Sequence, residues 1–240
     1  MDDIYGFRAR LGLIYPSPSY IMEPEFYLMS PVGVITCTTR VELKSIEVGS
    51  LERMGDDIVK CTKLLCDSRL DAIILGCTSG SFLHGPEYED ELIKRMQEAA
   101  DGVPCTTTST AIANALRKLQ VKKISVVTPY TNEINDLAKQ YLEKCGLEVC
   151  SIHGLRLVYD KDINSRPLEL NYRYAKSCLD DDSDAIVILC TALRTVPFIE
   201  YLEKDIGKPV VTAVASSFWH VLRLAGVYEA IDGFGTLLRK

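Results

Sequence analysis

Short, almost wholly apolar runs alternate along the chain with longer segments in which apolar residues recur every three or four positions. Several short runs lack the polar alternation of a half-exposed strand, which is typical of parallel strands covered on both faces. The runs predict eight β-strands, at residues 11–16, 33–39, 71–77, 103–109, 123–129, 147–155, 184–190 and 209–216. The pattern therefore predicts an α/β fold with parallel sheets.

The longer segments predict helices between these strands. Segment 50–68 places its apolar side chains on one helix face, and segment 131–146 has a threonine at its start and a glycine at its end, which are helix cap signals. Segments 166–182 and 216–226 have similar patterns. This alternation is typical of α/β units with right-handed crossovers.

One strand motif occurs twice. "LDAIILGCTSGS" at residues 70–81 recurs as "SDAIVILCTALR" at 183–194, so that 113 residues separate Cys77 from Cys190. In both copies Asp-Ala opens an apolar run and Cys-Thr closes it. We interpret the recurrence as an internal duplication, because chance similarity between apolar strands does not explain a shared offset at several positions.

Other elements repeat at the same spacing. Two predicted strands end at Pro16 and Pro129, again 113 residues apart. The fourth predicted strand of each copy leads from proline through Thr and Ser into a helix that ends in Leu-Arg. The repeat predicts two similar four-strand parallel subdomains related by a pseudo-two-fold axis. We assign residues 1–118 and 216–240 to the first subdomain and residues 119–215 to the second.

The duplicated cysteines are the candidate catalytic residues. Ligands of open parallel sheets bind beyond the carboxyl ends of the strands, where Cys77 and Cys190 both lie. Two opposed subdomains would direct the two thiols at one ligand in the cleft between them. Small residues and free N–H groups follow Cys77, and such groups lower a thiol pKa. We therefore expect Cys77 to have the lower pKa and to attack or abstract a proton, with Cys190 as the proton donor.

The composition excludes several other functions. The 240 residues carry a net charge of −6 with scattered acidic residues, which does not indicate nucleic-acid binding. No apolar run reaches the roughly 18–20 residues of a membrane span, and we see no signal peptide. Nine cysteines without zinc-type spacing indicate a reduced, cytoplasmic protein without a metal site. No nucleotide-binding glycine motif is present, and no histidine pairs with either cysteine motif in the sequence.

The motifs "LGLIYPSPSYIMEPEF", "GCTSGS", "VVTPYTNEIN" and "ILCTALRT" resemble the aspartate/glutamate racemase superfamily. Within it they are most similar to the branch of maleate cis–trans isomerase and arylmalonate decarboxylase. The resemblance covers nearly the whole chain. It implies an active site between two α/β subdomains, a small carboxylate substrate, and no metal or organic cofactor. We also expect a homo-oligomer, either a dimer or a tetramer, that binds neither nucleic acid nor membranes.

The resemblance also implies roles for the two cysteines. In maleate isomerase the first cysteine adds to the double bond and the second supplies a proton, whereas arylmalonate decarboxylase lacks the first cysteine. Because this chain has both Cys77 and Cys190, we expect a maleate isomerase-like enzyme that acts on a small mono- or dicarboxylic acid. The alternatives are a racemase of the aspartate, glutamate or hydantoin type, an arylmalonate decarboxylase-like enzyme, and a non-catalytic sensor of small acids.

The remaining predicted site residues are substrate contacts in the loops after the strands. Hydroxyl, amide and backbone N–H groups can hold a carboxylate there, and the residues that we expect to supply them are Ser19, Thr78, Ser79, Tyr130, Asn164 and Thr191. Ser19 departs from the isomerase pattern, which has asparagine at that place. We expect this shorter side chain, with the bulk of Tyr20 beside it, to change the shape of the carboxylate pocket.

Overall fold

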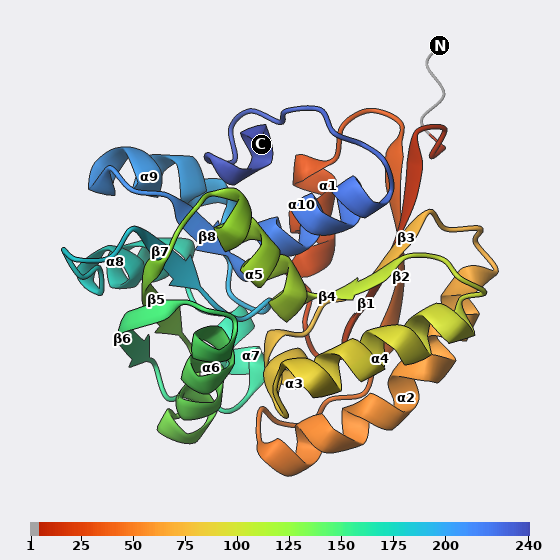
Figure 1. The fold of residues 1–240 in the computed structure, drawn as a ribbon, viewed down its shortest axis with the longest axis horizontal. Coiled ribbons are helices and arrows are strands. Elements are labelled where there is room, and N and C mark those ends of the chain that lie inside the picture. Colours follow the sequence, from red (N-terminus) through yellow and green to blue (C-terminus); the bar gives the residue numbers. More distant parts are fainter. Residues whose placement is uncertain (1–4) are drawn as a thin grey trace.

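Two parallel four-stranded sheets lie side by side in the computed structural model of the chain (Figure 1). The structure describes residues 5–240, apart from the side chains of Arg53 and Asp56, so residues 1–4 of the first predicted subdomain lie outside it. The strand orders are β2-β1-β3-β4 and β6-β5-β7-β8. The strands are β1 (Ala9–Pro16), β2 (Val34–Val41), β3 (Ala72–Leu75), β4 (Cys105–Thr107), β5 (Lys123–Thr128), β6 (Glu148–Gly154), β7 (Ala185–Ile188) and β8 (Val210–Thr212).

Helices follow the strands in both halves of the described chain. The α-helices are α1 (Met22–Met29), α2 (Val48–Cys66), α3 (Thr78–Phe82), α4 (Pro86–Ala99), α5 (Thr108–Lys118), α6 (Asn132–Lys144), α7 (Asp160–Asn164), α8 (Leu168–Ser177), α9 (Ile199–Ile206) and α10 (Ala213–Leu224). Two 3-10 turns, η1 (Val196–Phe198) and η2 (Leu237–Arg239), complete the elements. The predicted α/β class and the two parallel four-stranded sheets are confirmed, and the two sheets have equivalent strand orders.

The repeated aspartate has the same structural role in both halves. Oδ2 of Asp71 accepts a hydrogen bond of 2.7 Å from the Arg10 N–H, at the start of the neighbouring strand. Oδ2 of Asp184 accepts one of 2.8 Å from the Lys123 N–H, and 113 residues also separate these two donors. Backbone donors lower the pKa of Asp184. The duplication therefore extends to individual hydrogen bonds.

The helices that follow the fourth strands join the two halves. Helix α10 packs against α5 and contacts β3 of the first sheet as well as β8 of the second (Figure 1). The outer helices α2 and α4 pack instead on β2 and β4. Since α10 contacts both sheets, the predicted division of the chain at residues 118 and 216 stays a prediction.

All eight predicted strands are present, but the strands before the helices are shorter than expected. The predicted strand 103–109 ends at Thr107, whose side chain accepts a hydrogen bond from the Thr110 N–H as the cap of α5. Thr212 caps α10 in the same way. Thr131 also precedes its helix as expected, although its side chain makes no cap hydrogen bond. Threonines near a strand end thus begin the helix earlier than their β-propensity indicates.

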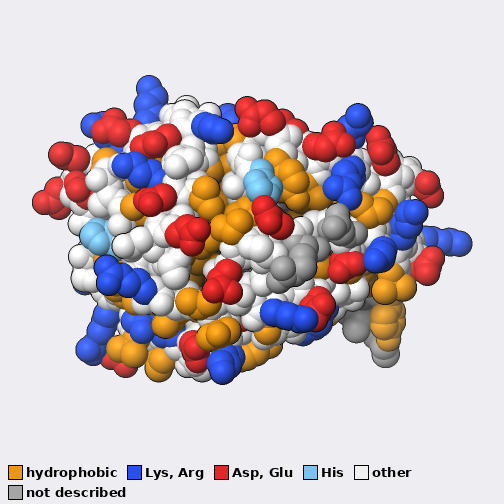
Figure 2. Space-filling model, turned by 90° about the horizontal axis from the view of Figure 1, so that it is seen from below, with side chains coloured by type: hydrophobic (Ala, Val, Ile, Leu, Met, Phe, Trp, Pro, Cys, Tyr) orange, Lys and Arg blue, Asp and Glu red, His pale blue; other side chains and the backbone are white. Residues whose placement is uncertain are grey.

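The central strands of both sheets are buried under the helices, whereas the edge strands β2 and β6 are largely half-buried or exposed. Every residue of β3 and β7 is buried, in agreement with their apolar sequences. Acidic and basic side chains are interspersed over the face shown in Figure 2. Across residues 5–240, no helix is both long and apolar enough to cross a membrane.

Candidate active site

An enclosed cavity lies where the carboxyl ends of the two sheets meet, and we call it the inner cavity. Its walls come from the loops after β1, β2, β3, β5, β6 and β7, which is the edge where parallel sheets bind ligands. The residues that line it are Pro16, Ser19, Leu43, Ile46, Cys77, Thr78, Ser79, Tyr130, Asp160, Cys190, Thr191 and Ala192. The two repeated cysteines therefore lie in one cavity, which they reach from different sheets.

Cys77 is the N-cap residue of the short helix α3, directly after β3. The Gly80 N–H and the Ser79 hydroxyl interact with its sulfur and favour the thiolate. Glycine leaves room for the thiol here, because a Cβ on Gly80 would lie 3.1 Å from the Cys77 sulfur and would displace the flexible end of the Met54 side chain. The sequence "GCTSGS" thus allows the N-terminus of α3 to lie close to the thiol.

Cys190 follows β7 with a different backbone conformation. Its φ is +88°, whereas φ of Cys77 is −141°. Positive φ is uncommon for a residue with a Cβ, and such strained residues recur at functional sites. The Ala192 N–H and the Tyr130 hydroxyl interact with the Cys190 sulfur and favour its thiolate. The duplication therefore preserves the position of the cysteine but not its local geometry.

Burial raises the pKa of both thiols. For Cys77 burial outweighs the N–H and hydroxyl donors and raises the pKa to about 12. For Cys190 burial is again the largest cause, and the nearby Asp160 carboxylate raises the pKa further. The pKa of Cys77 rises less than that of Cys190, which is the expected order, but the donors do not bring it below its usual value. The donors that we anticipated are present, but removal of water from the thiol has the larger effect.

Hydroxyl groups link the two cysteine loops. The Thr191 hydroxyl donates a hydrogen bond of 3.1 Å to the Gly76 carbonyl, which directly precedes Cys77. Tyr130 is 1% exposed, and burial followed by the two nearby thiols raises its pKa well above its usual value. Tyr130 is therefore a neutral hydroxyl at physiological pH that can donate a hydrogen bond to an anionic ligand.

Seven of the eight predicted site residues line the inner cavity, and Asn164 lies directly behind it. Asn164 is fully buried, and its Oδ1 accepts a hydrogen bond of 3.5 Å from the Ser19 hydroxyl. Its Nδ2 donates one of 3.2 Å to the Pro18 carbonyl. Asn164 therefore positions the first loop across the two halves. The roles of these residues toward a substrate stay predictions.

The expected effect of Tyr20 is wrong. Its ring is 49% exposed, and its hydroxyl accepts a hydrogen bond of 3.2 Å from Arg194. Neither residue lines the inner cavity. Tyr20 and Arg194 therefore pair outside the site, and Ser19 alone faces the cavity at this place.

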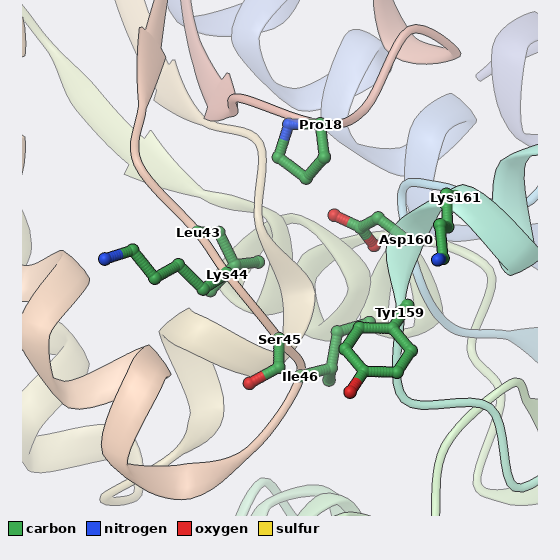
Figure 3. A pocket seen from close by; sticks show the side chains of 8 residues that line it. All are labelled: Pro18, Leu43, Lys44, Ser45, Ile46, Tyr159, Asp160 and Lys161. Carbon is green, nitrogen blue, oxygen red and sulfur yellow. The ribbon is translucent and has the colours of Figure 1, made fainter.

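A second space, which we call the outer cavity, adjoins the first. It has a volume of about 190 Å³ and shares Leu43, Ile46 and Asp160 with the inner cavity. Figure 3 shows the Asp160 carboxylate directed into the space between Pro18, Leu43 and Ile46. Asp160 could not be predicted as a cavity residue, because "YDKDIN" has no feature that distinguishes one aspartate from the other before the two halves meet.

The structure is closed over the inner cavity. Its volume is about 10 Å³, which is the space of a single water molecule. The Ile46 N–H, in the loop after β2, donates a hydrogen bond of 2.9 Å to the Val158 carbonyl, in the segment after β6. A substrate therefore needs these two segments to separate. Within the described chain, no group of three His, Cys, Asp or Glu side chains is arranged to hold a metal ion.

Comparisons with known proteins agree with the resemblance in the sequence. An arylmalonate decarboxylase from Bordetella bronchiseptica is 34% identical, over 95% of this chain and 95% of its own. A maleate isomerase from Pseudomonas putida is 26% identical, over 95% and 96%. The crystal structure of a cysteine-to-alanine variant of a maleate isomerase from Pseudomonas putida S16, solved with maleate, has a TM-score of 0.92 at 25% identity and covers 96% and 97%. The family model for arylmalonate decarboxylase matches residues 11–238, and the chain belongs to this family.

Proposed function

We propose that the chain is a cofactor-independent isomerase that converts a small cis-unsaturated carboxylic acid into its trans isomer. The observation that carries the proposal is the placement of Cys77 and Cys190 in one closed cavity, with the neutral Tyr130 hydroxyl between them. Similarity to maleate isomerases over nearly the full length supports it. Two thiols directed at one ligand can supply both a nucleophile and a proton donor.

The proposed mechanism starts from the thiolate of Cys77, whose proton passes to bulk water while the cavity is open and the thiol is still solvated. Its sulfur bonds to one carbon of the double bond, and the π electrons move toward the adjacent carboxylate. The Cys190 thiol then gives its proton to the neighbouring carbon. Rotation about the new single bond follows, after which the Cys190 thiolate removes the proton and the Cys77–carbon bond breaks. The trans acid leaves, and both cysteines return to their first state.

The hydroxyl and N–H donors have a defined task in this proposal. Negative charge develops on the substrate carboxylate when the thiolate adds, and fixed donors stabilise it without reorganisation. Thr78 is suited to this task, because its buried hydroxyl lies in the cavity wall beside the Tyr130 hydroxyl. Tyr130 and Thr191 lie beside it. The same donors explain how a cavity without a lining Lys or Arg binds an anion.

The test is turnover of maleate and of its monoamide, followed by proton NMR of the vinyl protons. Cys77→Ser should abolish turnover. Cys190→Ser should also stop turnover but leave an adduct on Cys77 that mass spectrometry detects. Cys150→Ser is the control, because Cys150 lies on β6 and lines neither cavity. Full turnover in both active-site variants would contradict the proposal, and an adduct only on Cys190 would reverse the two roles.

Decarboxylation of an arylmalonate is the second candidate, favoured by the 34% identity to an arylmalonate decarboxylase. That reaction needs a proton donor but no cysteine nucleophile. Cys77→Gly therefore distinguishes the two functions. If the variant still releases carbon dioxide from an arylmalonate, the result supports a decarboxylase, and if it loses cis–trans turnover, the result supports the isomerase.

We also propose that the chain is a cytoplasmic homo-oligomer. The free cysteines of the described chain agree with a reducing compartment, and they say nothing about the oligomeric state.

A further inference from the structure

Asp160 is an acidic side chain placed where an acidic substrate must pass. It begins α7 and lines both the inner and the outer cavity. Only 7% of the residue is exposed, and its Oδ2 atom is buried without a hydrogen-bond partner in the described part of the chain. A buried carboxylate oxygen without a donor is costly, so native structures rarely retain one without a use.

Among the residues that the structure describes, none places a cation against the Asp160 carboxylate. Lys161 is its neighbour, but the Lys161 ammonium lies over the Tyr159 ring at 5.4 Å from the centroid. Lys44 extends away from the carboxylate in Figure 3. Burial is the one cause that raises the Asp160 pKa, to about 6, and no charged neighbour lowers it. At pH 8 the group is therefore an anion and accepts hydrogen bonds only.

The two ends of a bound substrate meet different surroundings. The inner end faces the hydroxyl and N–H donors around Cys77 and Cys190, which suit a carboxylate. The outer end faces Asp160 together with the apolar side chains of Leu43 and Ile46. A second carboxylate there would place two like charges in a site with little water, whereas an amide would donate a hydrogen bond to the free oxygen.

We propose that Asp160 selects a cis-unsaturated carboxylate whose outer end carries a hydrogen-bond donor, as in the monoamide of maleate, over the corresponding dicarboxylate. This inference rests on the proposed isomerase function and names its substrate class. Asp160 is a specificity-determining residue in this proposal and takes no part in the bond changes at the double bond.

The kinetic test compares kcat/KM for maleate and for its monoamide at pH 8. The wild type should prefer the monoamide by at least about tenfold, because the dicarboxylate leaves the buried acceptor unpaired. Asp160→Asn has the same shape and turns an acceptor into a donor, so it should raise kcat/KM for maleate, lower it for the monoamide and reverse the preference. Asp162→Asn is the matched control, because Asp162 is exposed on the same helix and lines neither cavity.

A binding measurement separates this inference from the proposed function. Calorimetry with succinate and succinamate, which have no double bond, reports recognition without turnover. The wild type should bind succinamate more tightly, and Asp160→Asn should bind succinate more tightly. Equal affinity for the two ligands, no binding of either, or an unchanged preference in a folded Asp160→Asn variant would overturn the assignment of Asp160. Selective binding of succinamate with no turnover of either acid would instead overturn the isomerase proposal and leave the role of Asp160 standing.

Discussion

At the scale of single residues, the two cysteines differ in how much backbone strain they carry. Cys190 has φ of +88°, and Cys77 has an extended φ of −141°. A side chain with a Cβ at positive φ costs on the order of 1–2 kcal/mol relative to glycine. The surrounding contacts hold Cys190 in this conformation, among them the Thr191 hydrogen bond to Gly76.

This difference predicts opposite effects of glycine at the two positions. Cys190→Gly should be more stable than Cys190→Ala by about 1 kcal/mol, because both remove the thiol and only glycine relieves the strain. At position 77 the order should reverse, with Cys77→Gly less stable than Cys77→Ala by about 0.5–1 kcal/mol. Urea denaturation of the four variants measures both differences. A Cys190→Gly variant that is no more stable than Cys190→Ala would show that the Cys190 backbone is not strained.

Single residues also show where sequence reasoning ends. Cys77, Cys190 and Thr191 could be predicted because a repeat places them at strand ends. Asp160 could not, because its burial arises only when segments far apart in the sequence close over it. The rise of both thiol pKa values could not be predicted for the same reason: local N–H donors are visible in "GCTSGS", but the loss of solvent is a property of the assembled cavity.

At the scale of elements, apolar strands were predictable and short helices were not. Six strands (β1, β3, β4, β5, β7 and β8) contain buried runs of three or more residues, which a search for apolar runs detects, and the edge strands β2 and β6 do not. The five-residue helices α3 and α7 have no such period, because one or two turns cannot establish a face. Both helices begin at residues that line the inner cavity, Thr78 and Asp160. The polar residues of these two helices are therefore explained by the site better than by helix formation.

Helix α1 connects the two halves through a buried carboxylate. Oε1 of Glu25 accepts hydrogen bonds of 2.9 Å and 3.1 Å from the N–H groups of Thr195 and Val196, which follow β7. Oε2 is buried without a partner in the described chain. Burial outweighs the two N–H donors and raises the pKa of Glu25 to about 8. The folded protein therefore holds a proton on Glu25 that the unfolded chain releases near pH 4.3.

Stability should consequently depend on pH through Glu25. Between about pH 4.3 and pH 8 the folded state binds more protons than the unfolded state, so the free energy of unfolding falls as pH rises, by up to about 1.4 kcal/mol per pH unit. Glu25→Gln keeps an acceptor for the two N–H groups and should remove this slope. Urea denaturation at several pH values tests it, with the exposed Glu91→Gln as the control. A slope that persists in Glu25→Gln would assign the proton to another group.

At the scale of the whole molecule, the two halves are closed on one another around a site that neither completes alone. Cys77 comes from the first sheet and Cys190 from the second, and Ser19 meets Asn164 across the boundary. Duplication of one α/β unit explains why both halves present carboxyl strand ends to the same cleft. The divergence of the two copies, with glycine after Cys77 and positive φ at Cys190, supplies two thiols with different surroundings.

The hydrogen bond from Ile46 to Val158 gives this closure a spectroscopic reporter. The Ile46 amide proton points at a carbonyl of the other half, so it exchanges with deuterium only when the two segments part. We expect its exchange to be slower with bound succinamate than without ligand, while the Tyr5 amide near the chain start, far from the cleft in sequence, should be unaffected. Peptide-resolved exchange mass spectrometry measures both. If the Ile46 amide exchanges as fast as the amide of an unstructured loop, the cleft is already open in solution. If the amide is protected, its protection factor gives the fraction of molecules that are open to substrate at any moment.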